Sequence, residues 1–129
     1  MVDFTVAIPT YNGAERLPKV LEALRSQINT ESLSWAVLVV DNNSIDNTAE
    51  VFKQVQIDWP TNISLQYCVE PRQGAAYARQ QAVRSAQSLW VGLLDDDSIP
   101  ANNWVAQAYQ FGKANPQAGA FGGQIHGEF

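Results

Sequence analysis

Residues 89–100 read Leu-Trp-Val-Gly-Leu-Leu-Asp-Asp-Asp-Ser-Ile-Pro, an apolar run that ends abruptly in three adjacent carboxylates. A short apolar run bounded by turn residues is typical of a fully buried strand in a parallel sheet. Because side chains alternate along a strand, Asp95 and Asp97 are expected on one side and Asp96 on the other. Unpaired carboxylates about 5 Å apart repel by roughly 3 kcal/mol per pair at an effective dielectric constant near 20. The triplet therefore indicates either a site for Mg²⁺ or Mn²⁺, which suit oxygen ligands, or a solvated acidic turn that caps the next helix.

The rest of the chain alternates strand-like runs with helical patterns. Strands are predicted at residues 4–8, 36–40, 63–69, 89–94 and, more weakly, 118–125. The first helix is predicted to begin near Glu15, the second opens at Asp46 and ends before Pro60, the third follows Gly74, and the fourth ends at residues 115–116. The side chains expected to face the core are Leu17, Val20, Leu21, Leu24 and Ile28 in the first helix, Ala49, Phe52 and Val55 in the second, Ala75, Ala78, Ala82 and Ala86 in the third, and Trp104, Ala108 and Phe111 in the fourth.

Strands that alternate with helices at this spacing indicate βαβ units and a parallel sheet. The sequence contains no repeat, low-complexity tract or linker, so residues 1–129 are predicted to form a single domain. The expected fold is a three-layer α/β fold of Rossmann-like type, with helices flanking a mostly parallel sheet. Ligands of such folds bind at the carboxyl ends of the strands. The polar segments 9–12, 41–44, 70–74 and 95–97 each follow a predicted strand and should converge there.

Several residues in these segments suit a nucleotide, and each has a plainer interpretation. Tyr11 could stack on a base, or it could belong to an ordinary Asn-Gly turn. Asp41 could accept a hydrogen bond from a ribose hydroxyl or a base, or it could satisfy the backbone of its own turn. Gly74 begins a helix whose N-terminus could face the same cleft. Arg79, among alanines on that helix, could reach a phosphate or carboxylate, or lie solvated on the outer face.

Composition narrows the classes of protein. The 129 residues are 46% hydrophobic and 16% charged, as in a globular chain, and the formal net charge is −5. Without a run of Lys or Arg, a nucleic-acid partner is not expected, and an anionic ligand would need a metal or backbone N–H groups. The one cysteine, Cys68, is predicted to be buried and inert. The N-terminus lacks the basic start of a signal peptide, so a cytoplasmic location is expected.

Four segments together resemble a known family. Val-Ala-Ile-Pro-Thr-Tyr-Asn, Val-Val-Asp-Asn-Asn-Ser-Ile-Asp-Asn-Thr, Gly-Ala-Ala-Tyr-Ala-Arg and Leu-Asp-Asp-Asp-Ser-Ile-Pro occur in the order typical of the N-terminal part of a family 2 glycosyltransferase with the GT-A fold. The resemblance extends over nearly the whole chain. It implies an inverting enzyme that transfers a sugar from a nucleotide-sugar donor, with a UDP-sugar favoured, to a carbohydrate or lipid-linked acceptor in polysaccharide or glycolipid synthesis.

The resemblance also implies roles for individual residues. The positions that it implies as contacts of the donor are Pro9, Thr10, Tyr11, Asn12, Glu15, Asp41, Gly74, Arg79, Asp95 and Asp96. Among them, Asp41 would contact the base, Arg79 would lie near the diphosphate, and Asp95 would contact the ribose. Asp97 and Asp95 fit the family's Asp-x-Asp motif and would bind Mg²⁺ or Mn²⁺.

The family pattern departs from this sequence at the C-terminal end. The family's domain continues beyond the position of Phe129, and the catalytic Asp or Glu is expected there. The chain is therefore expected to be a C-terminally truncated donor-binding half, inactive or nearly so alone, whose parent could associate with the cytoplasmic face of a membrane. Two alternatives are open: a non-catalytic or self-associating module, and a phosphotransferase with an Asp nucleophile at Asp95. The second class places its motif after the first strand, which disfavours it here.

Overall fold

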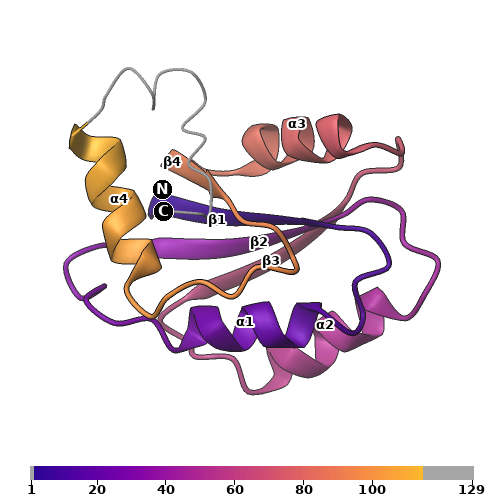
Figure 1. The fold of residues 1–129 in the computed structure, drawn as a ribbon, viewed down its shortest axis with the longest axis horizontal. Coiled ribbons are helices and arrows are strands. Elements are labelled where there is room, and N and C mark those ends of the chain that lie inside the picture. The colour runs from indigo at the N-terminus through magenta and orange to yellow at the C-terminus, as the bar shows by residue number, and fades with distance from the viewer. Residues whose placement is uncertain (1, 115–129) are drawn as a thin grey trace.

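The computed structural model describes residues 2–114, and in this part of the chain four strands form one sheet in the order β3-β2-β1-β4 (Figure 1). The elements follow one another as β1 (Val2–Thr10), α1 (Leu17–Arg25), β2 (Trp35–Asp41), α2 (Thr48–Ile57), β3 (Ser64–Val69), α3 (Ala75–Ser85), β4 (Ser88–Leu93) and α4 (Trp104–Ala114). All three strand pairs are parallel. This confirms the predicted α/β class and the first four strands. The fifth predicted strand, at 118–125, lies outside the described residues.

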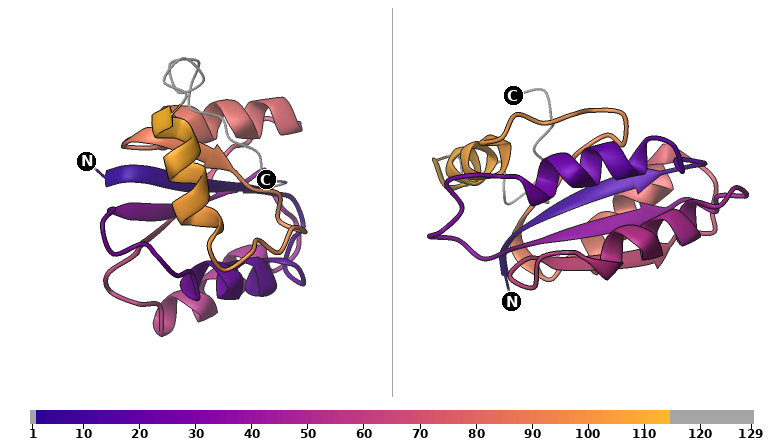
Figure 2. Two further views of the ribbon diagram at one scale, coloured as in Figure 1. Left: turned by 60° about the vertical axis from the view of Figure 1, so that its left-hand side comes forward. Right: turned by 90° about the horizontal axis from the view of Figure 1, so that it is seen from below.

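The helices cover the sheet on both faces. Figures 1 and 2 show α1 and α2 on one face and α3 on the other, with α4 at the end of the sheet where β1 begins. The larger core cluster joins alternate residues of β1, such as Phe4 and Val6, to α1, α2 and α4. The smaller cluster joins β1, β2 and β4 to Ala78 and Ala82 of α3, whose small side chains let that helix lie close to the sheet. The inward alanines at 78 and 82 were predicted correctly and Ala86 is partly buried against the same cluster, but Ala75 is exposed at the start of the helix, so its expected place against the core was wrong.

The topology of the sheet brings the loops that follow the strands to one edge. The chain runs from β1 outward to β2 and β3, then crosses to β4 on the other side of β1. The register aligns Thr10 with Asp41 and Asp41 with Val69, so these strands end side by side. In open parallel sheets a ligand crevice forms at the point where the strand order reverses, here between β1 and β4. The polar segments that follow the strands therefore meet at one edge of the sheet, as predicted.

Helix α1 begins two residues later than predicted and ends sooner. Its fully buried side chains are Leu17, Val20, Leu21 and Leu24, as the apolar stripe predicted. Arg16 occupies the N-cap position, and Glu15 lies exposed in the preceding turn. Since the helix ends at Arg25, Ile28 lies beyond it and is 47% exposed, so the expectation that it faces the core was wrong.

The other helices show smaller differences of the same kind. Helix α2 begins at Thr48 with Asn47 at the N-cap position, so the predicted cap Asp46 lies one residue too early, although its carboxylate accepts the backbone N–H of Thr48 at 3.1 Å. Ala49, expected to face the core, is exposed, whereas Phe52 is buried. In α4, Trp104 is buried against Phe4, but Phe111 is 42% exposed and was placed wrongly in the core.

Strand β3 lies at one edge of the sheet and is not buried on both faces. Its exposure alternates along the chain, with Leu65 and Tyr67 packed against the larger core and Val69 half exposed. Cys68 is half-buried on the opposite face, and burial raises the pKa of its thiol, which disfavours the reactive thiolate. An edge position explains why its pattern differs from that of the fully buried strand β2.

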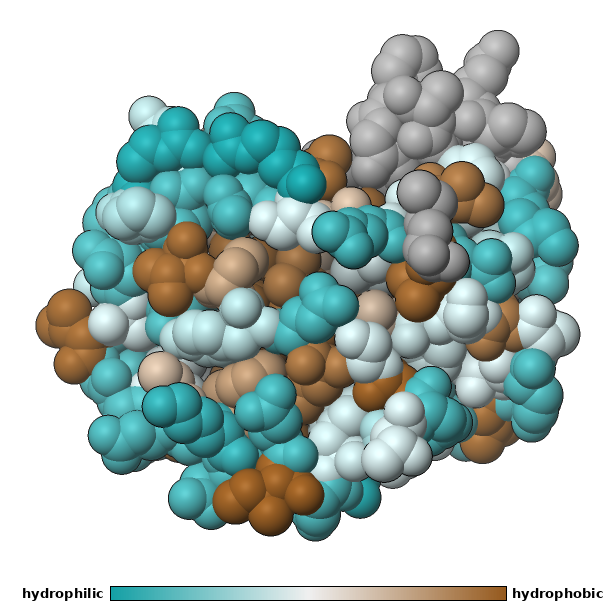
Figure 3. Space-filling model, turned by 180° about the vertical axis from the view of Figure 1, so that it is seen from behind, coloured by the Kyte–Doolittle hydropathy of each residue, from teal (hydrophilic) through white to brown (hydrophobic). Residues whose placement is uncertain are grey.

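Surface apolar groups are scattered. On the face shown in Figure 3, brown apolar side chains lie between hydrophilic ones. The exposed large apolar residues come from separate elements, among them Ile45, Ile57 and Leu89. Among the described helices, none is both long and apolar enough to cross a membrane.

Candidate functional site

A pocket of about 400 Å³ lies at the edge of the sheet where the strand order reverses. It is lined by Pro9, Thr10, Tyr11, Arg16, Asn42, Gln73, Gly74, Ala75, Ala78 and Asp96. Its size falls in the range of small-ligand sites. The lining comes from the loops after all four strands and from the N-terminus of α3, so residues far apart in the sequence form one surface.

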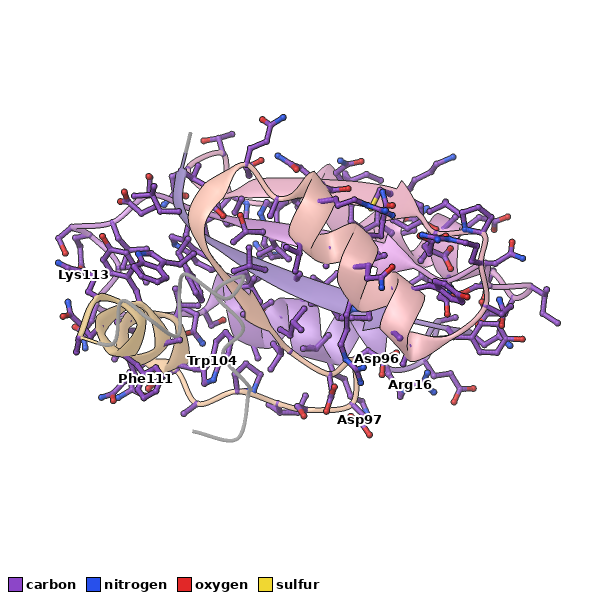
Figure 4. The ribbon with its side chains drawn as sticks, turned by 90° about the horizontal axis from the view of Figure 1, so that it is seen from above. Arg16, Asp96, Asp97, Trp104, Phe111 and Lys113 are labelled. Atoms are coloured by element: carbon purple, nitrogen blue, oxygen red, sulfur yellow. The ribbon has the colours of Figure 1, made fainter. Side chains whose placement is uncertain are left out.

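A buried hydroxyl and an arginine hold the middle carboxylate of the acidic triplet. Arg16 donates from Nε to Oδ1 and from Nη2 to Oδ2 of Asp96, both at 3.1 Å. Thr10, which is 3% exposed, donates its hydroxyl to Oδ2 at 2.6 Å. The hydrogen bond to Asp96 raises the pKa of Arg16 further above its ordinary value. Figure 4 shows Arg16 and Asp96 side by side, with Asp97 on the same turn.

Gly13 allows this arrangement to form. A Cβ atom at this position would lie 2.0 Å from Oγ1 of Thr10 and 2.8 Å from Oδ2 of Asp96. These two neighbours are hydrogen-bonded to each other, so displacing one of them alone would break that bond. The glycine of the Asn-Gly turn is therefore required by the close approach of these two side chains.

The loop after β1 is fastened to the loop after β2. Three successive backbone N–H groups donate to side chains of the second loop: Asn12 to Ser44 at 2.8 Å, Gly13 to Thr48 at 3.1 Å and Ala14 to Asp46 at 3.3 Å. Asn12 has a φ of +51° and accepts the N–H of Ile45 at 2.9 Å. The predicted donor residue Asn12 thus has a structural task, and the loop that carries Tyr11 is rigidly placed.

Asn42 organises the loop after β3. Its side-chain amide donates to the carbonyls of Glu70 at 3.0 Å and Arg72 at 2.7 Å, and its Oδ1 accepts the N–H of Gly74 at 2.9 Å. Its own N–H donates to the carbonyl of Thr10 at 2.8 Å. Gly74, with φ of +135°, then starts α3 at the wall of the pocket. The side-chain amide of Asn42 therefore joins the loop after β2 to the loop after β3, and its backbone N–H connects both to the end of β1.

Glu70 forms a second carboxylate–arginine pair in that loop. The buried carboxylate accepts the N–H of Arg72 at 2.9 Å and its guanidinium at 3.0 and 3.1 Å, with Arg84 at 3.6 Å. The hydrogen bonds from Arg72 lower the pKa of Glu70 to about 2. The guanidinium of Arg72 also lies over the ring of Tyr77, 4.5 Å from its centre. These residues do not line the pocket; they shape the loop that does.

Asp41 lies behind the pocket wall. It is 5% exposed, and its carboxylate accepts the N–H of Ser44 at 2.9 Å and the hydroxyl of Tyr67. Burial, together with the bond to Asp41, raises the pKa of Tyr67 above its ordinary value. Asp41 does not line the pocket, so the plainer interpretation accounts for its contacts, and its role toward a base stays a prediction.

The acidic triplet forms a turn instead of continuing the strand. Strand β4 ends at Leu93, and the N–H of Ser98 closes the turn on the carbonyl of Asp95 at 3.1 Å. Asp95 and Asp97 are exposed, whereas the side chain of Asp96 is 14% exposed. Strand alternation predicted that the side chain of Asp96 would point away from those of Asp95 and Asp97, and Asp96 is indeed the one turned inward. The stated reason was wrong, because the chain has already left the sheet at these residues.

A preformed metal site is not present within residues 2–114, where no three His, Cys, Asp or Glu residues are grouped to hold an ion. The residues that are present still suit Mg²⁺ or Mn²⁺, since one or two carboxylates commonly hold such an ion together with phosphate oxygens of a bound substrate. Asp95 and Asp97 supply two exposed carboxylates at one turn.

Sequence reasoning placed some residues at the site and missed others. Pro9, Thr10, Tyr11, Gly74 and Asp96 line the pocket, whereas Glu15 and Arg79 are exposed outside its lining. Five lining residues were not predicted as site residues: Arg16, Asn42, Gln73, Ala75 and Ala78. Asn42 and Gln73 belong to the converging segments and could have been chosen there. Arg16 has no local signal, since its partner Asp96 is 80 residues away.

Comparison with known proteins gives a consistent family. The family model described as glycosyl transferase family 2 matches residues 5–128. Glycosyltransferase AglE of Haloferax volcanii is 34% identical over 102 residues, which are 78% of this chain and 32% of the relative. The uncharacterized glycosyltransferase YfnE of Bacillus subtilis is 34% identical over 103 residues, 80% of this chain and 25% of the relative. The chain thus spans about a third or less of the length of these curated relatives.

Solved structures agree. Mannosyltransferase PcManGT from Pyrobaculum calidifontis, in complex with GDP-Man and Mn²⁺, is 29% identical with a TM-score of 0.77, covering 86% of this chain and 32% of that one. TarS 1-349 of S. aureus in complex with UDP is 22% identical with a TM-score of 0.70, covering 88% and 33%, and shows the fold alone. The predicted GT-A fold is confirmed. With its family model matched over nearly the whole length, the chain belongs to glycosyl transferase family 2.

Proposed function

We propose that this chain supplies the donor- and cation-binding half of a nucleotide-sugar-dependent glycosyltransferase. The observation that carries the proposal is the meeting of the acidic turn after β4 with the end of β1 and the N-terminus of α3 in one pocket. A relative of the same fold, PcManGT, holds GDP-Man and Mn²⁺. We propose a UDP-sugar as donor, following the sequence resemblance, and the test below includes GDP.

The pocket walls suit the parts of such a donor. Tyr11 is 44% exposed at the pocket, where its ring is available to stack on a base. The first backbone N–H groups of α3, at Ala75 and beyond, have no partner within the helix, and with the helix dipole they favour a diphosphate. Gln73 is held nearby by its bond to the carbonyl of Asn42 at 2.6 Å.

Asp95 and Asp97 would hold a divalent cation together with the donor diphosphate. When bound, such a cation neutralises negative charge that develops on the departing nucleotide. The two carboxylates would supply oxygen ligands to the cation, and with a net charge of −5 on the protein such neutralisation would favour the binding of an anionic ligand. The cation-binding roles of Asp95 and Asp97 are part of this proposal.

The remaining parts of the reaction are proposed from the resemblance. Transfer would invert the anomeric centre and use a carbohydrate or lipid-linked acceptor, on the cytoplasmic side. A general base, typically worth about 10²- to 10⁴-fold in rate, would deprotonate the acceptor hydroxyl. We propose that this base is not among the 129 residues, so that this chain alone transfers sugar slowly or not at all. The relatives, about three times as long, support this. We also propose that residues 1–129 form a single domain and that the chain can associate with copies of itself.

Calorimetric titration of UDP and GDP, with Mn²⁺ and with EDTA, tests the donor site. Binding of one nucleotide that depends on Mn²⁺ is expected, and Asp97→Ala should remove that dependence. Glu50→Gln, a change of an exposed carboxylate in the first turn of α2, is the control and should bind like wild type. If neither nucleotide binds to the wild-type chain, the donor-site proposal is wrong.

A further inference from the structure

The three neighbouring carboxylates of the acidic turn are not equivalent. Asp96 turns inward with its side chain 14% exposed, and Asp95 and Asp97 are exposed. A carboxylate offers about four acceptor positions, and Arg16 and Thr10 together occupy three of those on Asp96. Asp96 therefore has little capacity left for a ligand of its own.

The local charges support the same division. Three carboxylates carry three negative charges, and the guanidinium of Arg16 neutralises one of them at 3.1 Å. Two negative charges then remain, on Asp95 and Asp97, and they equal the charge of one divalent cation. Without Arg16, the middle carboxylate would lie unpaired between two others and would repel both.

Arg16 also contacts the loop after β1, in which Tyr11 lies. Its Nη2 donates to the carbonyl of Tyr11 at 3.0 Å as well as to Asp96. One guanidinium thus joins the loop that carries the aromatic ring to the turn that carries the acids. Gly13 packs against the same group of atoms, so the loop and the turn are in direct contact.

We infer that Arg16 is a positioning residue: by holding Asp96 it orients the acidic turn, so that Asp95 and Asp97 face the cation and Asp96 serves the turn alone. This inference rests on the proposed function, since it assigns work within the same site. It changes the role expected for Asp96, from a donor contact to the anchor of the turn.

The experiment compares Arg16→Gln, Arg16→Lys, Asp96→Asn and the double variant of Arg16→Gln with Asp96→Asn. The measured quantity is the ratio of nucleotide affinity in Mn²⁺ to that in EDTA, using UDP and GDP as probes. Arg25→Gln is the matched control, because Arg25 ends the helix that Arg16 begins and makes exposed contacts away from the pocket: ion pairs with Glu22 at 3.8 Å and Asp58 at 3.5 Å and a hydrogen bond to the Asp58 carbonyl at 3.2 Å. Thermal unfolding without metal shows whether each variant folds.

Arg16→Gln is expected to lower the Mn²⁺-dependent gain in affinity by on the order of tenfold, as for residues that orient metal ligands through hydrogen bonds. Arg16→Lys keeps the charge but loses the planar fork, so a smaller loss is expected; it also decides the matter if Arg16→Gln does not fold. Asp96→Asn should lower the Mn²⁺-dependent gain in affinity about as much as Arg16→Gln does. The double variant should lower it little further, because both substitutions break the same contact between Arg16 and Asp96.

Two results would overturn the inference while leaving the proposed function intact. In the first, Arg16→Gln and Arg16→Lys keep the Mn²⁺ dependence of the Arg25→Gln control. In the second, Asp96→Asn alone removes that dependence, which would make Asp96 itself a ligand. A wild-type chain whose nucleotide binding ignores Mn²⁺ would instead refute the proposed function and the inference with it.

Discussion

Two carboxylates in this protein are each held by an arginine fork, and they differ in how the pair is built. Glu70 and Arg72 are two residues apart in one loop, and the Glu70 side chain is 3% exposed. Asp96 and Arg16 are 80 residues apart, and Asp96 faces the pocket between two other acids. The first pair can form within its own loop, at little cost in chain entropy. The second pair forms only when β1 and β4 are paired, so its presence depends on the assembly of the site.

The two pairs should therefore respond differently to substitution. Changes at the Glu70 pair should lower the stability of the loop that supports α3 without touching a metal-dependent step. Changes at the Asp96 pair should alter the Mn²⁺ dependence of nucleotide binding more than they alter stability. Four variants test this contrast, in order of decreasing expected effect.

The largest effect is expected from Gly13→Ala. The added methyl group would lie 2.0 Å from Oγ1 of Thr10, so the loop must shift and the contact between Thr10 and Asp96 is lost. Overpacking of this kind costs about 2 kcal/mol of unfolding free energy. Denaturant unfolding and nucleotide titration should both show a loss. Unchanged Mn²⁺ dependence in a folded Gly13→Ala chain would contradict the close coupling of loop and turn.

Glu70→Gln should come next, and its effect should depend on pH. The pKa of Glu70 is about 2 in the folded chain against an ordinary value of 4.5. A lowered pKa contributes stability that is fully present above pH 4.5 and is lost as the pH falls toward 2. Unfolding free energy measured from pH 6 to pH 2 should fall less steeply for Glu70→Gln than for wild type. Equal slopes would mean that the Arg72 contact does not persist in solution.

Arg72→Lys should cost less than Glu70→Gln, because the positive charge stays while the fork and the stacking over Tyr77 are lost. Its Mn²⁺ dependence of nucleotide binding should equal that of wild type, in contrast to Arg16→Lys. The crossed comparison of these two lysine variants, by titration and by thermal unfolding, is the sharpest test of the contrast. A loss of Mn²⁺ dependence in Arg72→Lys would show that the two carboxylate–arginine pairs do not differ in this respect.

The smallest effect is expected for Arg84→Gln. Its guanidinium lies 3.6 Å from Glu70, and its side chain is 58% exposed. A surface substitution of this kind usually changes the unfolding free energy by less than about 0.5 kcal/mol. Calorimetry should find Arg84→Gln close to wild type at neutral pH. A large drop would show that Glu70 depends on two arginines instead of one.

The fold was largely predictable because its signals are local. Short apolar runs predicted β1 through β4, and apolar residues at helical spacing predicted α1 through α4, in order. The errors arose where an element ended or where the sheet had an edge. Ile28 continues the apolar pattern of α1 but lies beyond its end, and β3 has a neighbouring strand on one side only.

The site was predictable only as a set of loops. Parallel strands bring their carboxyl ends together, so segments 9–12, 41–44, 70–74 and 95–97 could be assigned to one edge from the sequence. Which side chains face the pocket depends on backbone turns. Asp41 bends away to Tyr67, whereas its neighbour Asn42 reaches the pocket wall, and adjacent positions in a turn carry no period that distinguishes them.

The sequence by itself determined the order of the elements, the parallel sheet and the edge at which the acids lie, because each follows from residues close together in the chain. Only the tertiary structure decided that Asp96 faces inward while Asp95 and Asp97 stay exposed. The partners that draw Asp96 inward, Thr10 and Arg16, come from the other end of the chain. They reach it only because β1 and β4 are neighbours, and a contact formed by strand pairing leaves no pattern in the sequence near either residue.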